Sequence, residues 1–361
     1  MEEQEVIERT RQYLNKSKCS EAEFNEQALL LFRYQFEFNL PYQSYCRTKG
    51  KTPRLVRHWK EIPPVPINAF KEVQLSCGDV EKADAIFMTS GTTKSVRGKH
   101  YHPTLEVYDQ STIMHFQERF MGADEQLPMG ILFPNTKALP NSSLAHYLAL
   151  VAKEFSGQNC TYFIDDNGLQ IEKLIQELEQ RELAGEPYAL LGASFSFVHL
   201  FEELKARGRT FSLPKGSKML DTGGFKNQSE EMDLEMFYQK MNDYLGIDRK
   251  NCVNMFGMTE LSTQLYDDGN EILPSVKSGP HWFKSRVVHP ATGEDMPDGE
   301  PGVLVHYDLA NFNSVLAILT EDMGVKKGAG FLSLGRVQGA EAKGCSLALD
   351  EFIQAAKGAI R

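Results

Sequence analysis

Residues 89–98 read Thr-Ser-Gly-Thr-Thr-Lys-Ser-Val-Arg-Gly and directly follow the apolar run Ala-Ile-Phe-Met at 85–88. The run predicts a buried strand, and the stretch after it predicts a loop of small hydroxylated residues and glycine. Such a loop brings backbone N–H groups and hydroxyls close to an anion, because no bulky side chain stands in the way. The stretch therefore indicates a phosphate-binding loop, with a plain surface turn as the alternative.

Two common nucleotide-binding motifs do not fit this loop. A Walker A motif needs Ser or Thr after its Gly-Lys pair, but Gly98-Lys99 is followed by His100. The Gly-x-Gly-x-x-Gly fingerprint of dinucleotide-binding folds does not occur here either. A P-loop NTPase and a dinucleotide-dependent enzyme are therefore disfavoured.

Composition narrows the class of protein further. The chain has 361 residues, of which 41% are hydrophobic and 24% charged, and a net charge of −10. These values are typical of a soluble globular protein and argue against a nucleic-acid surface. The acidic start of the chain is unlike a signal peptide, and the six scattered cysteines include no Cys-x-x-Cys pair. We therefore expect a cytoplasmic protein with reduced thiols and no zinc ribbon.

Hydrophobic patterning predicts an α/β fold. Strands are expected at 84–88, 129–133, 160–164, 188–193, 217–221 and 252–256, and helices at 104–121, 142–155, 168–184, 195–207 and 229–245. This alternation favours mostly parallel sheets flanked by helices.

The two ends of the chain follow other patterns. Helices are expected at 4–14 and 20–38, and the proline-rich segment 62–66 should be extended. Beyond residue 280, apolar segments at 283–289, 302–308 and 315–320 predict a small antiparallel section, and a short helix is expected at 347–358.

Two later segments also suit nucleotide chemistry. Residues 254–260 read Asn-Met-Phe-Gly-Met-Thr-Glu; Phe256 beside Gly257 can stack a base, Thr259 can contact a phosphate, and Glu260 can bind a divalent cation. One carboxylate suffices for Mg²⁺, which takes its remaining ligands from phosphate and water. The alternative is a strand end with a buried Phe and a capping Thr.

Residues 220–226 read Leu-Asp-Thr-Gly-Gly-Phe-Lys. Gly223 and Gly224 allow the backbone to approach a flat adenine closely, because they carry no side chain. A simple Gly-Gly turn is the alternative.

The loop at 89–98 resembles the phosphate-binding signature of adenylate-forming enzymes, Thr-Ser-Gly-Thr-Thr-Gly-x-Pro-Lys-Gly. Lys94 and Val96 depart from that pattern, and Arg97 keeps the charge of its lysine. The matching residues are Thr89, Ser90, Gly91, Thr92, Thr93 and Gly98. The segment ending at Glu260 is similar to the family's Tyr-Gly-x-Thr-Glu, with Phe256 in place of Tyr.

Two further matches complete the family order. Thr-Glu-Asp-Met-Gly at 320–324 resembles Thr-Gly-Asp-Leu-Gly, whose aspartate, here Asp322, binds ribose hydroxyls. Gly335-Arg336 resembles the Gly-Arg at the family's hinge. The resemblance implies that ATP and Mg²⁺ are bound by these segments, each expected at a strand end or in a loop.

Segments 39–46, 62–71 and 343–352 narrow the resemblance to the acyl-protein synthetase branch, the LuxE type, over about residues 20–355. The resemblance implies that a carboxylic acid, expected to be a fatty acid, reacts with ATP to give acyl-AMP. The acyl group then passes to a cysteine near the C-terminus, here Cys345, and on to a partner reductase of the LuxC type.

The residues around Cys345 agree with a nucleophile. It precedes an expected helix that starts near Leu347, and a helix N-terminus and Lys343 would both favour a thiolate. The alternative is an inert packed cysteine.

The resemblance also predicts a domain arrangement. An adenylate-forming large domain is expected at 1–335, with a helical N-terminal region at about 1–60, and a short tail at 336–361 that carries Cys345 in place of the family's lid. Two other functions remain open. One is an acyl- or aryl-CoA ligase of the phenylacetate-CoA ligase type; the other, suggested by Lys94 and Val96, is a non-catalytic nucleotide-binding relative.

Overall fold

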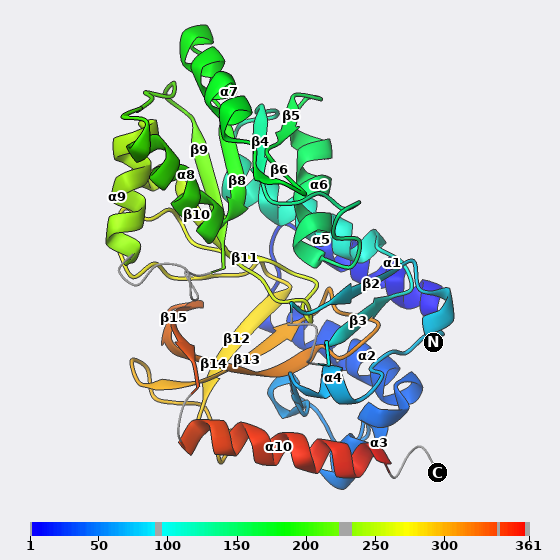
Figure 1. Ribbon diagram of the computed structural model, residues 1–361. Helices are drawn as coiled ribbons and strands as arrows, with labels where there is room; N and C mark the ends of the chain where they lie inside the picture. Colours follow the sequence, from blue (N-terminus) through cyan, green and yellow to red (C-terminus); the bar gives the residue numbers. More distant parts are fainter. Residues whose placement is uncertain (1, 91–95, 224–232, 338–339, 358–361) are drawn as a thin grey trace. The chain divides into compact units, whose positions relative to one another are not determined.

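The computed structural model describes residues 2–90, 96–223, 233–337 and 340–357 (Figure 1), without the side chains of residues 340–343 and of Cys345. Contacts divide the chain into two compact units. Unit 1 comprises Met1–Ser111, Met258–Thr263 and Ser278–Arg361, and unit 2 comprises Thr112–Gly257 and Gln264–Lys277. The domain boundary expected at residue 335 stays a prediction.

Unit 2 is built on one mostly parallel sheet with the strand order β11-β10-β9-β8-β4-β5. Its strands are β4 (Met129–Leu132), β5 (Cys160–Tyr162), β8 (Ala189–Ala193), β9 (Lys218–Thr222), β10 (Cys252–Phe256) and β11 (Leu265–Tyr266). Only the β10–β11 pair is antiparallel within this sheet. The predicted parallel α/β arrangement is confirmed.

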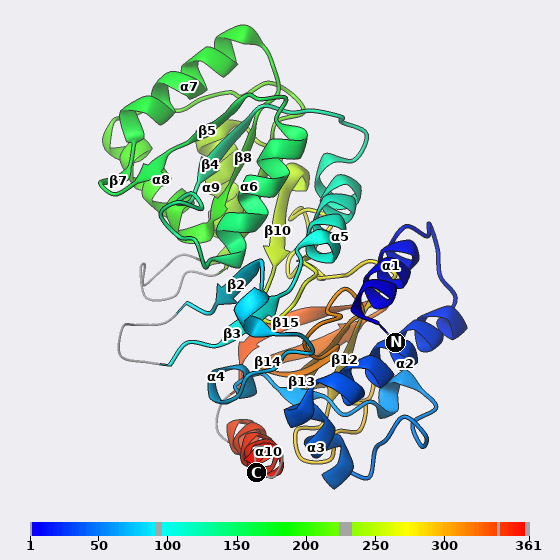
Figure 2. The same cartoon turned by 90° about the vertical axis from the view of Figure 1, so that its right-hand side faces the viewer.

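Helices cover both faces of this sheet (Figure 2). They are α6 (Ser143–Phe155), α7 (Ile171–Ala184), α8 (Ser194–Ala206) and α9 (Leu234–Leu245). Successive strand residues face opposite sides: Leu190 of β8 packs in the core under α7, α8 and α9, and Leu191 packs in the core under α6. Strands buried on both faces read as continuous apolar runs, which is why the sequence pattern located them well.

Unit 1 contains a five-stranded, mainly antiparallel sheet with the order β1-β14-β13-β12 and β15 paired to β14. Its strands are β1 (Val65–Pro66), β12 (Phe283–Val288), β13 (Pro301–Asp308), β14 (Ala317–Lys327) and β15 (Gly330–Arg336). The predicted antiparallel section is thus present, but β14 runs well past residue 320 and β15 was not expected. Thr320 and Asp322 consequently lie inside a long strand and not at its end.

The strand before the phosphate loop is paired differently from the prediction. β2 (Ala85–Met88) was expected among the parallel strands, but it pairs antiparallel with β3 (Lys99–His102) in a separate two-stranded sheet. Its burial pattern is also mixed, with only Phe87 fully buried. The short apolar run alone could not reveal this, because the partner strand, Lys-His-Tyr-His, is polar.

The N-terminal part of unit 1 is helical. α1 (Glu3–Leu14) and α2 (Glu21–Phe38) match the expectation, and Ser20 and Glu23 form a capping box at the start of α2. α3 (Leu40–Thr48) was not predicted, although Asn39 caps it and its second residue is Pro41.

The remaining elements are short or connect larger ones. α5 (Glu106–Phe116) continues into a π-helical turn, η3 (Gln117–Met121). The others are α4 (Ala69–Glu72), η1 (Trp59–Glu61), η2 (Val80–Lys82), η4 (Arg249–Asn251), β6 (Ile164–Asp165) and β7 (Gly168–Leu169). Within the described ranges no helix is long and apolar enough to cross a membrane.

The C-terminal helix α10 (Ala340–Lys357) begins earlier than the expected residue 347. It packs against α3: the rings of Phe352 and Tyr45 lie 4.9 Å apart, and Ser44 Oγ donates to the carbonyl of Ala355 at 2.6 Å. A Cβ on Gly344 would lie only 3.1 Å from the carbonyl oxygen of Pro290. Gly344 therefore has a packing role inside the helix, because it lets the helix approach the Pro290 backbone closely.

Candidate active site

The two ends of the phosphate loop are tied together in unit 1. Thr89 N–H donates to the Gly98 carbonyl at 3.0 Å, and Gly98 N–H donates to Thr89 Oγ1 at 2.9 Å. Arg97 donates from Nε to the carbonyl of Thr89 at 2.6 Å. Ser90 is exposed at the start of the loop, and the predicted binding residues Gly91, Thr92 and Thr93 lie outside the described residues. The hydroxyl of Thr89 thus closes the loop.

The end of the loop lies against the carboxylate of Glu260. A Cβ built on Gly98 would be 3.1 Å from Thr89 Cγ2, 3.5 Å from Glu260 Oε1 and 3.5 Å from Phe70 Cβ. Glycine at this position therefore lets the backbone approach the carboxylate closely. The structure brings two independently predicted segments, the loop and the Thr-Glu motif, into contact.

Glu260 is a buried acid. Loss of solvent raises its pKa to about 7, and the positive charges of Lys71 and Arg336 oppose that rise. Among the described residues no side chain donates a hydrogen bond to its carboxylate. A buried carboxylate that receives so few hydrogen bonds can bind a cation. An anionic ligand nearby would then bind to the same cation.

The turn that carries Thr259 and Glu260 is held by its backbone. His100 Nδ1 donates to the carbonyl of Thr259 at 2.9 Å, and Asn311 Nδ2 donates to the carbonyl of Glu260 at 2.9 Å. Burial lowers the pKa of His100 to about 4, so the ring is neutral. His100 thus has a structural role beside the loop.

Asp308, which the sequence did not single out, anchors the residues after Glu260. Its carboxylate accepts from the N–H groups of Ser262 and Thr263 at 2.8 and 2.9 Å, and from Thr263 Oγ1 at 2.8 Å. It is fully buried, and this burial raises its pKa to about 6. Asp308 is the last residue of β13, so this carboxylate connects the motif to the antiparallel sheet.

Asp322 and Arg336 face each other on neighbouring strands of unit 1. The two residues are paired in the β14–β15 register. Arg336 Nε lies 3.7 Å from Asp322 Oδ1, and its Nη1 lies 3.3 Å from Glu321 Oε2. The charge of Arg336 also lowers the pKa of Glu260, and the charge of Asp322 raises it. The three predicted residues Glu260, Asp322 and Arg336 therefore interact electrostatically.

Unit 2 carries the other predicted binding residues at one edge of its sheet. Thr222 of β9 and Met255 of β10 are paired in parallel register. Gly223 and Phe256, which follow them, therefore leave the carboxyl ends of adjacent strands, where α/β folds bind ligands. Gly223 has a φ of +88° and open space at its Cβ position. Gly257 is exposed, and Gly224 lies outside the described residues.

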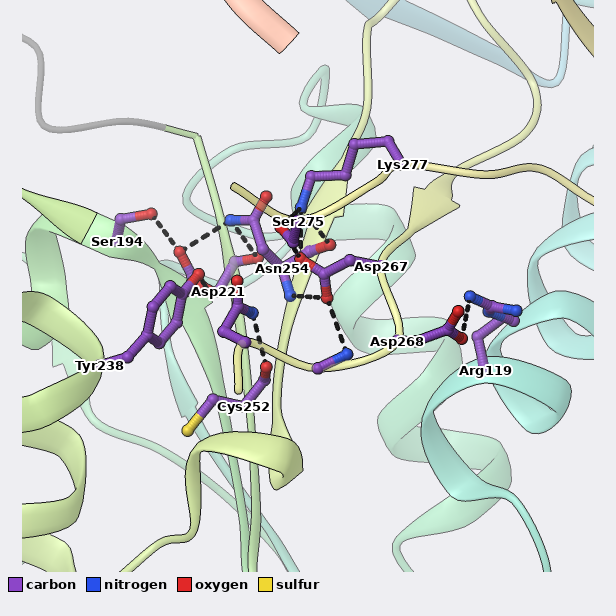
Figure 3. Close-up of polar contacts among 12 residues, drawn as sticks. Arg119, Ser194, Asp221, Tyr238, Cys252, Asn254, Asp267, Asp268, Ser275 and Lys277 are labelled. Atoms are coloured by element: carbon purple, nitrogen blue, oxygen red, sulfur yellow. Dashed lines mark hydrogen bonds and ion pairs between the residues drawn. The ribbon is translucent and has the colours of Figure 1, made fainter. Parts of the chain in front are cut away.

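The buried carboxylate of Asp221, near the end of β9, accepts hydrogen bonds from neighbouring elements of unit 2 (Figure 3). Asp221 accepts from Ser194 Oγ at 2.7 Å, Tyr238 Oη at 3.0 Å and Asn254 Nδ2 at 2.9 Å. Desolvation raises its pKa to about 6. Asp221 of β9 is thus bonded to Asn254 of β10 and to Ser194, the first residue of α8, which directly follows β8. The sequence did not predict this role.

The described residues include no group of three or more His, Cys, Asp or Glu side chains that could hold a metal ion. A magnesium ion that accompanies a nucleotide needs only one or two protein carboxylates. The buried, sparsely hydrogen-bonded carboxylate of Glu260 fits that requirement. Such an ion would neutralise phosphate charge beside the loop.

Cys345 is placed differently from the expectation. It lies inside α10 and not before a helix, because the helix starts at Ala340. A helix dipole acts mainly within the first turn, so the predicted stabilisation of a thiolate by a following helix is wrong. Its side chain is outside the described part of the chain.

The fold is similar to that of a CoA ligase of known structure. An open conformation of 2-hydroxyisobutyryl-CoA ligase, in complex with 2-HIB-AMP and CoA, superposes with a TM-score of 0.62 at 14% identity. The match covers 88% of this chain and 74% of that chain.

The family is shown by the sequence comparisons. A family model described as "Acyl-protein synthetase, LuxE" matches residues 6–354. The long-chain-fatty-acid–luciferin-component ligases of Aliivibrio fischeri and Vibrio harveyi are 23% and 20% identical over 336 residues, which are 90% of this chain and 86% of each relative.

The chain therefore belongs to the LuxE acyl-protein synthetase family. It is an ATP-dependent ligase that activates a carboxylic acid, and the predicted resemblance is confirmed.

Proposed function

We propose that this protein joins a long-chain fatty acid to AMP and then transfers the acyl group to the thiol of Cys345, from which a partner reductase takes it. The contact between Gly98 and the Glu260 carboxylate carries the first half of this proposal. It unites a phosphate-binding loop with a carboxylate suited to Mg²⁺ in a member of a family of acyl-protein synthetases. The names of the two relatives support a fatty acid as the substrate.

In the first step, a carboxylate oxygen attacks the α-phosphorus of ATP. A P–O bond to the acid forms as the bond to the β-phosphate breaks, and pyrophosphate leaves with the electron pair. No proton has to move, because the acid reacts as its anion. The loop that ends at Gly98 would hold the departing phosphates, and Glu260 would hold the Mg²⁺ that neutralises them.

In unit 1, Asp322 would accept hydrogen bonds from the ribose hydroxyls, as carboxylates do. Phe256 and Gly223 would line the adenine with a ring and an open backbone. Thr259 would contact a phosphate through its hydroxyl. These assignments follow the motif matches.

In the second step, the Cys345 thiolate attacks the acyl carbonyl and AMP leaves with the bonding pair. α10 is docked on α3 through Phe352, Ala355 and the Lys49–Glu351 ion pair at 2.6 Å. Cys345 lies nearer the start of the helix than these contacts. We propose that this part of the helix moves to present the thiol.

The test combines two measurements on one protein. ATP–pyrophosphate exchange against short-, medium- and long-chain acids should be fastest with a long-chain acid. Intact mass after incubation with ATP and that acid should show one acyl adduct, which Cys345→Ser abolishes and the control Cys19→Ser retains. Robust exchange with an unmodified wild type would remove the acyl-protein step, and equal acylation of added CoA by Cys345→Ser would indicate a CoA ligase.

A further inference from the structure

Lys71 lies beside the candidate adenylation site on the short helix α4. Its neighbour Phe70 is buried, with Cβ 3.5 Å from the position of a Cβ on Gly98. The Phe70 ring also packs edge-on against His100, with centroids 5.8 Å apart. Phe70 thus fixes α4 against the end of the phosphate loop and leaves Lys71 exposed next to it.

Hydrogen bonds connect Lys71 with the two strands that carry Asp322 and Arg336. Lys71 Nζ donates to Asn68 Oδ1 at 2.7 Å, and Asn68 Nδ2 donates to the carboxylate of Glu321. The same carboxylate accepts from Arg336 Nη1 at 3.3 Å. A continuous polar chain therefore orients Lys71 from β14 and β15.

The charge of Lys71 is free to act on a ligand. Arg336 already faces the carboxylates of Glu321 and Asp322, and Arg97 donates to backbone carbonyls. Across the described parts of the chain, Lys71 has no acidic partner within ion-pair distance; its hydrogen bond is to a neutral amide oxygen. It is nevertheless close enough to Glu260 to act on that carboxylate.

We propose that the Lys71 ammonium binds the α-phosphate of ATP and the attacking carboxylate during adenylation. Both reactants are anions, so their approach is opposed by charge repulsion that a cation between them relieves. Negative charge accumulates on the α-phosphate oxygens as the acid–phosphorus bond forms and pyrophosphate leaves. Lys71 donates hydrogen bonds and keeps its proton throughout. This inference rests on the proposed function of the site.

The matched experiment compares Lys71→Met, Lys71→Arg and the control Lys82→Met. Methionine keeps an unbranched apolar stem without the charge, and Lys82 is another exposed lysine of the same unit, on η2. ATP–pyrophosphate exchange and the Kd for ATP are measured with each purified protein, after circular dichroism has shown a folded chain. We expect Lys71→Met to lower kcat by about 10²-fold, because a lost transition-state contact typically costs this much.

The Kd for ATP should change by less than about fivefold, because the contact tightens as charge develops. Lys71→Arg should recover most of the rate, and Lys82→Met should match the wild type. A Lys71→Met protein with a kcat close to that of wild type, or a Lys71→Arg protein as impaired as Lys71→Met, would overturn the assignment. Absence of exchange in the wild type would instead refute the proposed function, so the two failures are distinguishable.

Discussion

Wild-type unit 2 should lose stability as the pH rises, because its buried Asp221 ionises. Replacement of Asp221 by asparagine should remove this loss. Burial raises the pKa of Asp221 to about 6, whereas an aspartate in an unfolded chain titrates near 3.9. Between these values the folded state binds more protons than the unfolded state. The stabilisation from Asp221 is therefore complete below about pH 4 and is lost as the pH rises through about 6.

The size of the effect follows from the difference between the two pKa values. About two units correspond to about 3 kcal/mol in the free energy of unfolding. Roughly 1.4 kcal/mol of this is lost between about pH 5 and about pH 8, since the unfolded carboxyl is already ionised at the lower pH. Asparagine cannot ionise, so the stability of Asp221→Asn relative to wild type should rise by this amount across the range.

Urea unfolding at several pH values measures this difference. Circular dichroism should follow it, because both tryptophans, Trp59 and Trp282, belong to unit 1 and Asp221 belongs to unit 2. Altered hydrogen bonds to Ser194 or Tyr238 would shift the variant's stability by a constant, so only the pH-dependent part tests the reasoning. Equal m-values are required for the comparison.

The control is Asp268→Asn, which changes an acid with an 87% exposed side chain in the same unit. Its ion pair with Arg119 should contribute little, because water and salt screen exposed charges. The reasoning is refuted if Asp221→Asn differs from wild type by the same free energy at every pH. That result would mean that Asp221 is already ionised in the folded protein at the acidic end.

Two further changes probe the proposed nucleotide contacts. Glu260→Gln should slow ATP–pyrophosphate exchange by about 10²-fold and raise the Mg²⁺ concentration needed for half-maximal rate, because a metal ligand loses its charge. The control Glu72→Gln, at an exposed residue on α4, should leave both quantities unchanged. An unaltered Mg²⁺ requirement in Glu260→Gln would exclude Glu260 as the ligand. Asp322→Ala should raise the KM for ATP by roughly 10- to 100-fold through loss of charged hydrogen bonds. The same substitution should have almost no effect on the KM for dideoxy-ATP, and an equal loss with both nucleotides would show that Asp322 does not bind the ribose.

The parallel sheet of unit 2 could be predicted from sequence because its strands are locally marked. Ala189–Ala193 and its neighbours are apolar runs bounded by turns, and helix-length amphipathic segments separate them. The candidate binding residues were found for a similar reason, since they belong to short local motifs of Gly, Thr and acidic residues.

The errors occurred where the structure depends on distant partners. β2 pairs with the polar strand β3, which hydrophobic patterning does not mark. α10 continues through Gly344 because this glycine packs against Pro290, more than fifty residues earlier in the chain. A local pattern contains no information about either partner, so a short helix after Cys345 was the natural expectation and proved wrong.

The same dependence explains why the sequence identified Glu260 but not the residues that position it. The carboxylate of Glu260 accepts no side-chain hydrogen bond from the described residues, and its turn is held through backbone atoms by His100, Asn311 and Asp308. These three residues come from β3, from the segment after β13 and from the end of β13. A buried polar side chain that bonds to the backbone has no recognisable motif, because any donor or acceptor with the right placement would serve. The motif therefore specifies the chemistry at Glu260, whereas its position beside Gly98 is specified by residues far away in the chain.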